Sequence, residues 1–364
     1  HQTAGSPGSR MLVCSVCGDR YDRYGAAWRC DCGAPLDFAD QPLPDSDPDI
    51  DAARGLWAFE SFLPTGPEVT LGEGFTPLTE SAEWDCAFKL EYVFPTGSFK
   101  DRGATTTLSL AAEQGVDRVV EDSSGNAGAA IATYAARAGI DASIYVPASV
   151  KASKLRAIER AGAAVVRVEG TRGDVTDACV DAVESGAGWY ASHAWNPAFF
   201  AGTATFAYEV AAQRGWEVPD VVVTPLGHGT LFLGAYRGFR ALQRAGWTDS
   251  MPRLLGAQAA GYAPIADDLH GPSEEENDVA DGIQIRDPAR EAQIHEAIEA
   301  TDGDAIALSE SRVSETLDSL HAAGFYTEPT CAVAPAALEE YRARGVVSPD
   351  DDVVVPLTGS GLKG

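Results

Sequence analysis

From about Leu56 onward, short apolar runs alternate with longer segments of helical pattern. The runs are rich in β-branched residues and bounded by turn-forming residues: DRVVED, ASIYVP, AVVRVE, DVVVTP, RLLGAQ and DVVVPL. Alanine-rich segments such as NAGAAIATYAARAG and TLFLGAYRGFRALQRAG lie between them. Because continuously apolar strands that alternate with helices form parallel sheets covered on both faces, the pattern predicts an α/β fold. A length of 364 residues favours two domains.

The part of the chain before Leu56 has a different character. The opening stretch HQTAGSPGSR lacks the charged and then apolar plan of a signal peptide, and Met11 resembles a natural start. We therefore expect residues 1–10 to be a tag or a disordered extension. The stretch QPLPDSDPDIDA is typical of a linker. No apolar run approaches the roughly 20 residues that span a bilayer, so we expect no membrane partner.

The charge balance further limits the classes of partner that we expect the chain to bind. The chain has 54 acidic and 27 basic residues, a formal net charge of -27, and the acids are scattered over its whole length. A basic partner would favour clustered acids, whereas a scattered acidic surface poor in lysine is typical of a cytoplasm with high salt, which screens the self-repulsion. Nucleic acid is not expected as a partner, because phosphate binding needs basic surface. The lysines are Lys89, Lys100, Lys151, Lys154 and Lys363.

Four cysteines near the amino terminus have the spacing of a metal site. They form one C-x2-C pair and one C-x-C pair beside turn-forming residues: Cys14, Cys17, Cys30 and Cys32. In the cytoplasm such knuckles favour a tetrahedral, structural Zn2+ site over disulfides, and four thiolates leave no position for a catalytic water. Two disulfides or metal-free thiols are the alternatives. Isolated cysteines in apolar surroundings, which we expect in the core, are Cys86, Cys179 and Cys331.

The stretch YVFPTGSFKDRGATTTLSLAA places Lys100 just before an amphipathic run. A desolvated lysine amine is easily deprotonated and attacks carbonyl groups, which suits imine chemistry. Taken alone, the residue is more typical of a solvated surface lysine. Two loops elsewhere in the chain change this interpretation.

Both loops join a predicted strand to a predicted helix. DRVVED leads into SSGNAG, whose backbone N–H groups and serine hydroxyls would receive a carboxylate at the positive end of the helix. DVVVTP leads into LGHGTLFLG, where Gly227 and Gly229 let the backbone approach a phosphate and Thr230 caps the helix. Few classes of α/β protein combine such a lysine with a carboxylate-binding loop and a phosphate-binding loop.

The motifs PTGSFKDRG, SSGNAG, PLGHGTLFLG and LTGSGLK occur in this order and resemble those of fold-type-II pyridoxal-phosphate enzymes, above all the threonine synthase family. The likeness runs from about Met11 to Lys363, and the cysteine segment is similar to the zinc ribbon of many microbial threonine synthases. The resemblance implies two domains, each with a mostly parallel sheet flanked by helices, plus a small amino-terminal zinc ribbon. It also implies a small amino-acid substrate and a homodimer.

The resemblance further implies roles for individual residues. Lys100 would be the catalytic residue and bind pyridoxal 5'-phosphate covalently. The other cofactor-binding residues would be Asn126 at the ring oxygen, Gly227, His228, Gly229 and Thr230 at the phosphate, and Thr358 or, as the alternative, Ser360 at the pyridine nitrogen. The substrate-binding set would be Ser124, Gly125, Asn126, Ala127, Gly128 and His193. A hydroxyl at the ring nitrogen favours elimination and replacement over transamination.

The expected domain boundaries follow from the same resemblance. Residues 11–39 would be the zinc ribbon, 40–105 with 201–364 the large cofactor-binding domain, and 106–200 the small substrate-side domain.

One stretch, HAWNPAFFAGTATFAYEV, departs from the family. Ala194 and Phe199 stand where the family usually carries an arginine and small polar residues for the phosphate of O-phosphohomoserine, and His193 is the only ionisable group nearby. We expect both residues to line the far end of the substrate pocket, where an apolar wall is a poor host for a dianion. The leading hypothesis is threonine synthase or a close paralogue. The alternative is a dehydratase-like enzyme that eliminates or replaces at Cβ of serine, threonine or an O-activated serine. A non-catalytic zinc-ribbon scaffold is a remote third possibility.

Overall fold

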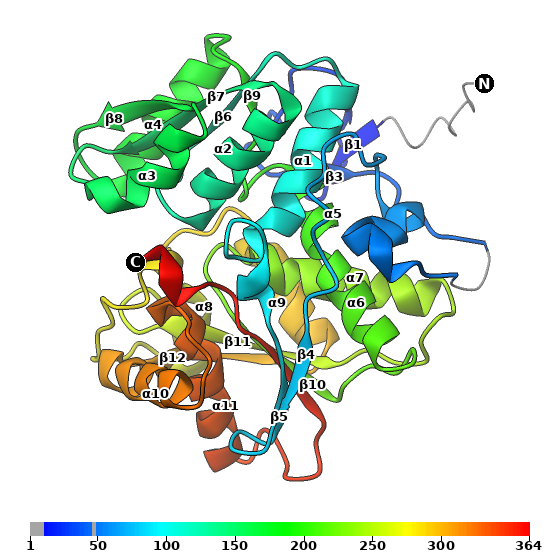
Figure 1. The fold of residues 1–364 in the computed structure, drawn as a ribbon, viewed down its shortest axis with the longest axis vertical. Helices are drawn as coiled ribbons and strands as arrows, with labels where there is room; N and C mark the ends of the chain where they lie inside the picture. Colours follow the sequence, from blue (N-terminus) through cyan, green and yellow to red (C-terminus); the bar gives the residue numbers. More distant parts are fainter. Residues whose placement is uncertain (1–10, 46–48) are drawn as a thin grey trace. The chain divides into compact units, whose positions relative to one another are not determined.

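The computed structural model describes residues 11–45 and 49–364, so the predicted tag at 1–10 lies outside the described residues. The chain divides into two compact units, drawn in Figure 1. The first unit contains the residues up to Glu73 and Lys100–Gly202, and the second contains Gly74–Phe99 and Thr203–Gly364. Residues 40–73, which we had placed in the large domain, group with the first unit.

The amino-terminal ribbon (residues 11–39) opens the first unit. Its three short antiparallel strands have the order β2-β1-β3. The strands are β1 (Met11–Cys14), β2 (Arg20–Asp22) and β3 (Leu36–Phe38). Leu12, Cys14, Cys30 and Leu36 are buried together as a miniature core.

A parallel sheet of four strands forms the body of the first unit, in the order β8-β7-β6-β9. The strands are β6 (Arg118–Glu121), β7 (Asp141–Pro147), β8 (Ala164–Val168) and β9 (Trp189–Tyr190). The helices of this unit are α1 (Lys100–Glu113), α2 (Asn126–Ala138), α3 (Ala152–Arg160), α4 (Arg172–Glu184) and α5 (Pro197–Thr203). Small alanine side chains of α2 pack against Val119 and Ile144 of the sheet in one core cluster.

The second unit contains a six-stranded sheet in the order β12-β11-β10-β13-β5-β4, parallel except for the edge strand β4. Its strands are β4 (Leu78–Ser81), β5 (Cys86–Lys89), β10 (Val221–Pro225), β11 (Arg253–Ala259), β12 (Asp304–Leu308) and β13 (Val353–Pro356). Its helices are α6 (Thr205–Gln213), α7 (Thr230–Arg244), α8 (Pro264–His270), α9 (Glu291–Ala300), α10 (Glu310–Ala322) and α11 (Val333–Ala343).

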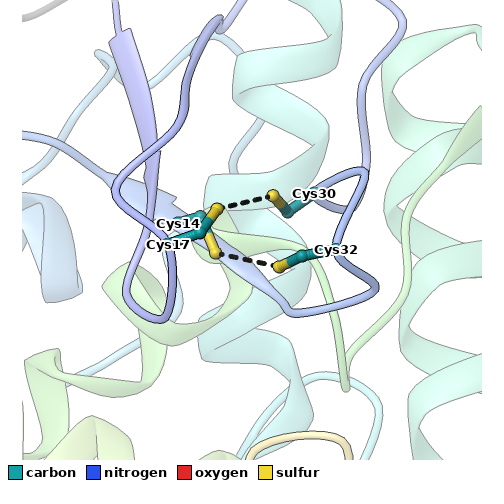
Figure 2. A group of neighbouring side chains, drawn as sticks. All are labelled: Cys14, Cys17, Cys30 and Cys32. Carbon is teal, nitrogen blue, oxygen red and sulfur yellow. Dashed lines mark hydrogen bonds between the residues drawn. The ribbon is translucent and has the colours of Figure 1, made fainter.

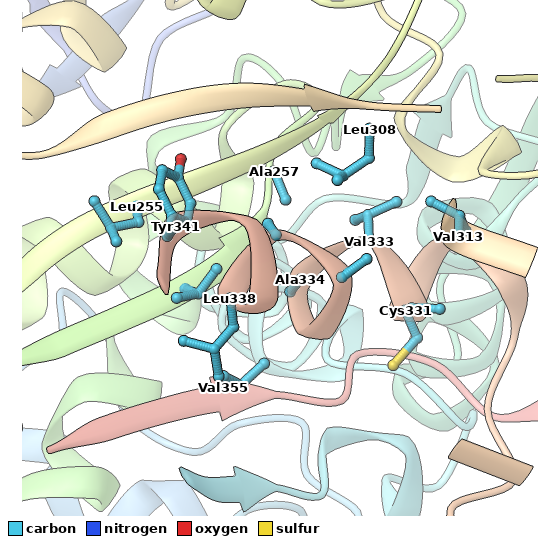
Figure 3. Close-up of a cluster of buried hydrophobic side chains, with 14 of the residues drawn as sticks. Leu255, Ala257, Leu308, Val313, Cys331, Val333, Ala334, Leu338, Tyr341 and Val355 are labelled. Carbon is cyan, nitrogen blue, oxygen red and sulfur yellow. The ribbon is translucent and has the colours of Figure 1, made fainter. Parts of the chain in front are cut away.

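The core of the second unit forms where α11 lies against the sheet (Figure 3). Leu338 and Tyr341 of α11 pack with Leu255 of β11 and Val355 of β13. The three isolated cysteines predicted to lie in the core are all buried. Within the described residues, no helix is both long and apolar enough to cross a membrane. The predicted α/β class with mostly parallel sheets is confirmed.

The close approach of α1 and α5 corrects one expectation. Phe199 of α5 is fully buried in the core of the first unit, and a Cβ atom at Gly103 of α1 would lie 2.0 Å from its ring. A Cβ atom at Gly202 would likewise lie 2.0 Å from the Arg102 carbonyl oxygen. The expectation that Phe199 lines the substrate pocket is therefore wrong: its ring holds two helices together. An arginine there would place a charge in the core.

This packing yields a stability prediction. We expect Gly103→Ala to lower the free energy of unfolding by about 1–3 kcal/mol, because the new methyl group has no room beside the Phe199 ring. Urea unfolding measures the effect. The matched control is Gly173→Ala in α4, where the nearest atom to the added Cβ is the Thr171 Oγ1 at 3.5 Å. Equal losses for the two variants would contradict the packing argument.

Candidate active site

Lys100 is the first residue of α1, and its side chain is half-buried. The residue before it belongs to the second unit, where the Phe99 N–H donates to the Thr358 carbonyl oxygen at 3.1 Å. Lys100 lies near enough to His193 and Glu121 for its charge to lower the pKa of both groups. The amine therefore belongs to the polar cluster of the first unit.

Lys89, on β5 of the second unit, is the contrasting lysine. Its side chain is fully buried, and its Nζ lies 3.1 Å from Glu209 Oε1. The same amine donates to the Thr76 carbonyl oxygen and to Gln213 Oε1, each at 2.9 Å. These contacts give Lys89 a structural role, because breaking a buried ion pair lowers the free energy of unfolding.

The start of α1 is anchored to α2 through a buried hydroxyl. Tyr134 donates to Glu73 Oε2 at 3.0 Å, and its oxygen lies 3.3 Å from Oδ2 of Asp101, the residue after Lys100. Burial raises the pKa of Tyr134 above its usual range, so the hydroxyl stays a donor. This contact fixes where the Lys100 side chain begins.

The SSGNAG segment (residues 123–128) joins β6 to α2. Its Gly125 is the N-cap of α2 and has no side chain with which to cap the helix. The Gly125 N–H donates to Ser123 Oγ at 3.2 Å, which closes the turn. A Cβ atom at Gly128 would lie 1.8 Å from the Ser123 carbonyl oxygen, so only glycine fits this close return. The segment presents backbone N–H groups at the positive end of a helix, as a carboxylate requires.

Glu121, at the end of β6, holds His193. Its Oε2 accepts the His193 backbone N–H at 3.0 Å and lies 3.1 Å from His193 Nδ1. Burial raises the pKa of Glu121 to about 7. Burial and the charge of Lys100 hold the pKa of His193 well below its usual range, so the imidazole is neutral. His193 therefore supplies no positive charge.

Asp122, the residue between β6 and the SSGNAG segment, has both carboxylate oxygens occupied. Tyr190 donates to Oδ1 at 2.6 Å and Thr176 donates to Oδ2 at 2.7 Å. Burial and the neighbouring Glu121 raise the pKa of Asp122 to about 6. Sequence reasoning missed Glu121, Asp122 and Tyr190. The signal that could have found the acids is their position at the end of the apolar run DRVVED.

The glycine-rich loop of the second unit lies between β10 and α7. Gly229 is the N-cap of α7 and adopts a left-handed conformation at φ 82°. Added Cβ atoms would lie 3.2 Å from Ile283 at Gly227 and 2.8 Å from Ile294 at Gly229. His228, between the glycines, is half-buried, and the Thr230 carbonyl oxygen accepts from Thr203 Oγ1 at 2.8 Å. The glycine backbone and the start of a 15-residue helix form a cradle suited to a phosphate.

The carboxyl-terminal motif lies beside residues 97–99 in the second unit. Thr358 and Ser360 are both buried. The Ser360 N–H donates to the Gly97 carbonyl oxygen at 2.8 Å, and its hydroxyl accepts the Leu362 N–H at 3.1 Å as a helix cap. Both hydroxyls can still donate, because accepting the Leu362 N–H leaves the Ser360 O–H available.

The four cysteines of the ribbon converge (Figure 2). Their sulfur atoms all lie within 4.8 Å of one another, with Cys14 and Cys32 separated by 3.6 Å and Cys17 and Cys30 by 3.3 Å. Sulfurs about 2.3 Å from a central zinc would be about 3.8 Å apart. Deprotonated thiols are the form that a metal binds, so metal affinity at this site would fall at low pH. All four are free cysteines, so the alternative of two disulfides is not observed.

The structure brings the predicted residues together in two groups. Lys100, the SSGNAG segment and His193 belong to the first unit, and the glycine-rich loop with Thr358 and Ser360 belongs to the second. The two mostly parallel sheets flanked by helices, with Lys100 at the start of α1 and glycine-containing turns ahead of α2 and α7, are features of the fold-type-II class. Residues 69–359 match the family model described as pyridoxal-phosphate dependent enzyme. The chain belongs to this family.

The relatives support the assignment. The threonine synthase of Methanocaldococcus jannaschii is 31% identical over 96% of this chain and 92% of its own. The threonine synthase of Methanosarcina acetivorans is 32% identical over 97% of this chain and 92% of its own. Among solved structures, a threonine deaminase from T.th. is 25% identical, with a TM-score of 0.65 over 79% of this chain and 92% of that one. The predicted resemblance to the threonine synthase family, the predicted fold class and the prediction of a pyridoxal-phosphate enzyme are confirmed.

The elevated pKa of Glu121 predicts a pH dependence of stability. Its pKa rises from 4.5 to about 7 on folding, so the folded state holds the proton more tightly. The resulting stabilisation is complete below about pH 4.5 and is lost as the pH rises through about 7. Relative to Glu121→Gln, the wild type should lose on the order of 3 kcal/mol of unfolding free energy over this range.

Urea unfolding from pH 4.5 to 8 measures this difference. The control is Glu275→Gln at an exposed position, whose pH profile should match the wild type. A parallel pH profile for the wild type and Glu121→Gln would show that Glu121 is not the titrating group.

Proposed function

We propose that the chain uses pyridoxal 5'-phosphate to eliminate or replace a group on the side chain of a small amino acid, with O-phosphohomoserine to threonine and phosphate as the leading reaction. The observation that carries the proposal is that the first unit contains both the half-buried Lys100, at the start of α1, and the turn of the SSGNAG segment, at the start of α2, whose N-cap Gly125 offers no side-chain cap. An amine and a carboxylate-binding helix start in one unit suit an amino-acid substrate. The family match and the two threonine synthases support it.

Each unit, considered by itself, has residues that suit a part of the cofactor. The glycine cradle at Gly227–Thr230 suits its phosphate, and Thr358 would place a hydroxyl at its ring nitrogen. Asn126, at the start of α2, would donate to its ring oxygen. When bound, the cofactor supplies an electron sink that stabilises negative charge at the substrate Cα. A neutral hydroxyl at the ring nitrogen leaves that nitrogen unprotonated, which favours elimination and replacement.

The protein residues would then orient the substrate and move protons. Backbone N–H groups of Ser124, Ala127 and Gly128 would hold the substrate carboxylate, while the Gly125 N–H closes the turn on Ser123 Oγ. This would orient the Cα–H bond toward Lys100. The Lys100 amine would remove the Cα proton as a general base. The side-chain group would then leave, for O-phosphohomoserine as phosphate from Cγ together with loss of a Cβ proton. Addition of water at Cβ would complete a replacement and give threonine, and exclusion of that water would leave an elimination.

The second candidate is elimination or replacement at Cβ of serine, threonine or an O-activated serine. The specific observation in its favour is the neutral His193, held by Glu121. This imidazole does not offer the positive charge that the phosphate of O-phosphohomoserine requires. Incubation with O-phosphohomoserine, O-phosphoserine, O-acetylserine, serine and threonine, each assayed for phosphate, 2-oxo acid and amino-acid products, separates the two candidates.

We also propose that the ribbon binds one structural Zn2+ through Cys14, Cys17, Cys30 and Cys32. The sulfur positions support this, and no ligand position would remain for a water.

The lysine assignment predicts the behaviour of a simple variant. Lys100→Ala should lose turnover on every substrate and the visible absorbance of the bound cofactor, because no other amine lies at the start of α1. Circular dichroism should show an intact fold, since the side chain is half-buried and not part of the core. Lys154→Ala, at an exposed position on α3, is the control and should retain both properties. A Lys100→Ala protein with wild-type turnover would overturn the assignment.

The metal assignment predicts zinc content. Elemental analysis should find about one zinc per chain, and Cys17→Ser should abolish it, because one of four ligands is lost. Cys86→Ala removes a buried thiol outside the ribbon and should leave the zinc content unchanged. Wild-type protein without zinc, or Cys17→Ser protein that retains it, would contradict the site.

A further inference from the structure

The ribbon contacts the body of the first unit at several places. One of them is an ion pair between Arg29 and Glu184 of α4 at 2.7 Å, and two of the other contacts involve aromatic side chains. At one, Arg23 pairs with Glu113 of α1 at 3.1 Å, and the Tyr24 hydroxyl donates to the same carboxylate at 3.0 Å. At the other, Trp28 packs edge-on against Tyr190 and Trp195, with ring centroids 5.1 Å apart in both pairs. Trp28 lies two residues before Cys30, so its position depends on how the cysteines are held.

The second contact continues toward the candidate site. Tyr190 pairs with Val120 in the β6–β9 register, and its hydroxyl donates to Asp122 Oδ1 at 2.6 Å. Asp122 immediately precedes the SSGNAG segment, and its other neighbour, Glu121, holds His193. Each side chain in this series contacts the next. Trp28 therefore supports the turn that would bind the substrate carboxylate.

Among the described residues, no comparable series of side chains leads from the first contact, at Arg23 and Tyr24, to the SSGNAG segment. Arg23 and Tyr24 reach the end of α1 at Glu113, the last residue of the 14-residue helix that begins at Lys100. Loss of that contact would loosen the ribbon without touching Tyr190. The two contacts thus differ in what they support, although both join the ribbon to the same unit.

We propose that Trp28 is a positioning residue for the substrate-binding turn, acting through Tyr190 and Asp122, and that the metal of the ribbon holds Trp28 in place. In that case the ribbon contributes to the affinity of the enzyme for its substrate. The consequence for amino-acid binding rests on the proposed function, whereas the coupling between ribbon and turn does not.

The test compares Trp28→Ala with a matched aromatic pair in the second unit. Trp216 and Trp247 also pack edge-on at 5.1 Å and 81°, as Trp28 and Tyr190 do, so Trp247→Ala removes an equivalent contact away from the turn. The holoenzyme is titrated with L-alanine, which has no side-chain leaving group, and the visible absorbance change gives its affinity. Hydrogen exchange of the amides at 122–128 reports the order of the turn without reference to the cofactor.

Trp28→Ala should weaken L-alanine binding and raise KM by about two- to tenfold, with kcat nearly unchanged, because one aromatic contact is lost. Exchange at 122–128 should become faster. Trp28→Phe keeps a ring at the contact and should restore both readouts, and Trp247→Ala should match the wild type. Wild-type affinity in Trp28→Ala, or equal weakening in Trp247→Ala, overturns the proposal.

Two further arms test the intermediate steps. Tyr190→Phe keeps the ring against Trp28 but removes the hydroxyl from Asp122, and it should reproduce the weaker L-alanine binding even if Trp28→Ala fails to fold. Removal of zinc by a chelator should reduce the near-ultraviolet circular dichroism of Trp28 and lower the affinity to the Trp28→Ala level. Unchanged affinity for L-alanine in Tyr190→Phe, or after removal of zinc, would contradict the proposed series of contacts from Trp28 to the turn. A wild-type protein with no cofactor absorbance would refute the proposed function, while the exchange data would still decide the coupling.

Discussion

Two adjacent carboxylates at the end of β6, one buried and one half-buried, are the constraint on which the candidate site of the first unit depends. Glu121 and Asp122 cannot both remain charged in the interior without donors, and burial raises the pKa of each. The Asp122 N–H donates to Glu121 Oε1, and the other three oxygens accept from groups far away in sequence: His193, Tyr190 and Thr176. The need to satisfy these oxygens joins β6, β9 and α4 at the point where the SSGNAG segment begins.

The sheets could be predicted because their strands are continuously apolar. All six apolar runs form strands, namely β6, β7, β8, β10, β11 and β13. The four cysteines were also predictable, since short knuckles bring their ligands together with little help from the rest of the chain. Strands β4, β5, β9 and β12 were missed. Strand β9 has only two residues, and its pairing with β6 depends on tertiary contacts rather than on local pattern.

The rest of the site depends on contacts that local sequence does not encode. Glu121 and His193 are 72 positions apart, and their contact exists only because β6 and the segment after β9 meet. Phe199 was misplaced for the same reason: the space above Gly103 is created by two helices crossing closely. The homodimer and the high-salt cytoplasm stay predictions, because both concern the surroundings of the chain.

The central claim is that Lys100, at the start of α1, binds pyridoxal 5'-phosphate covalently. Borohydride reduction of the holoenzyme, followed by peptide mass mapping, tests it most directly, because reduction makes the link between lysine and cofactor permanent. The account predicts the pyridoxyl mass on the peptide that contains Lys100, with Lys89, Lys151, Lys154 and Lys363 unmodified. A pyridoxyl group on any of those four lysines, with Lys100 unmodified, would contradict it.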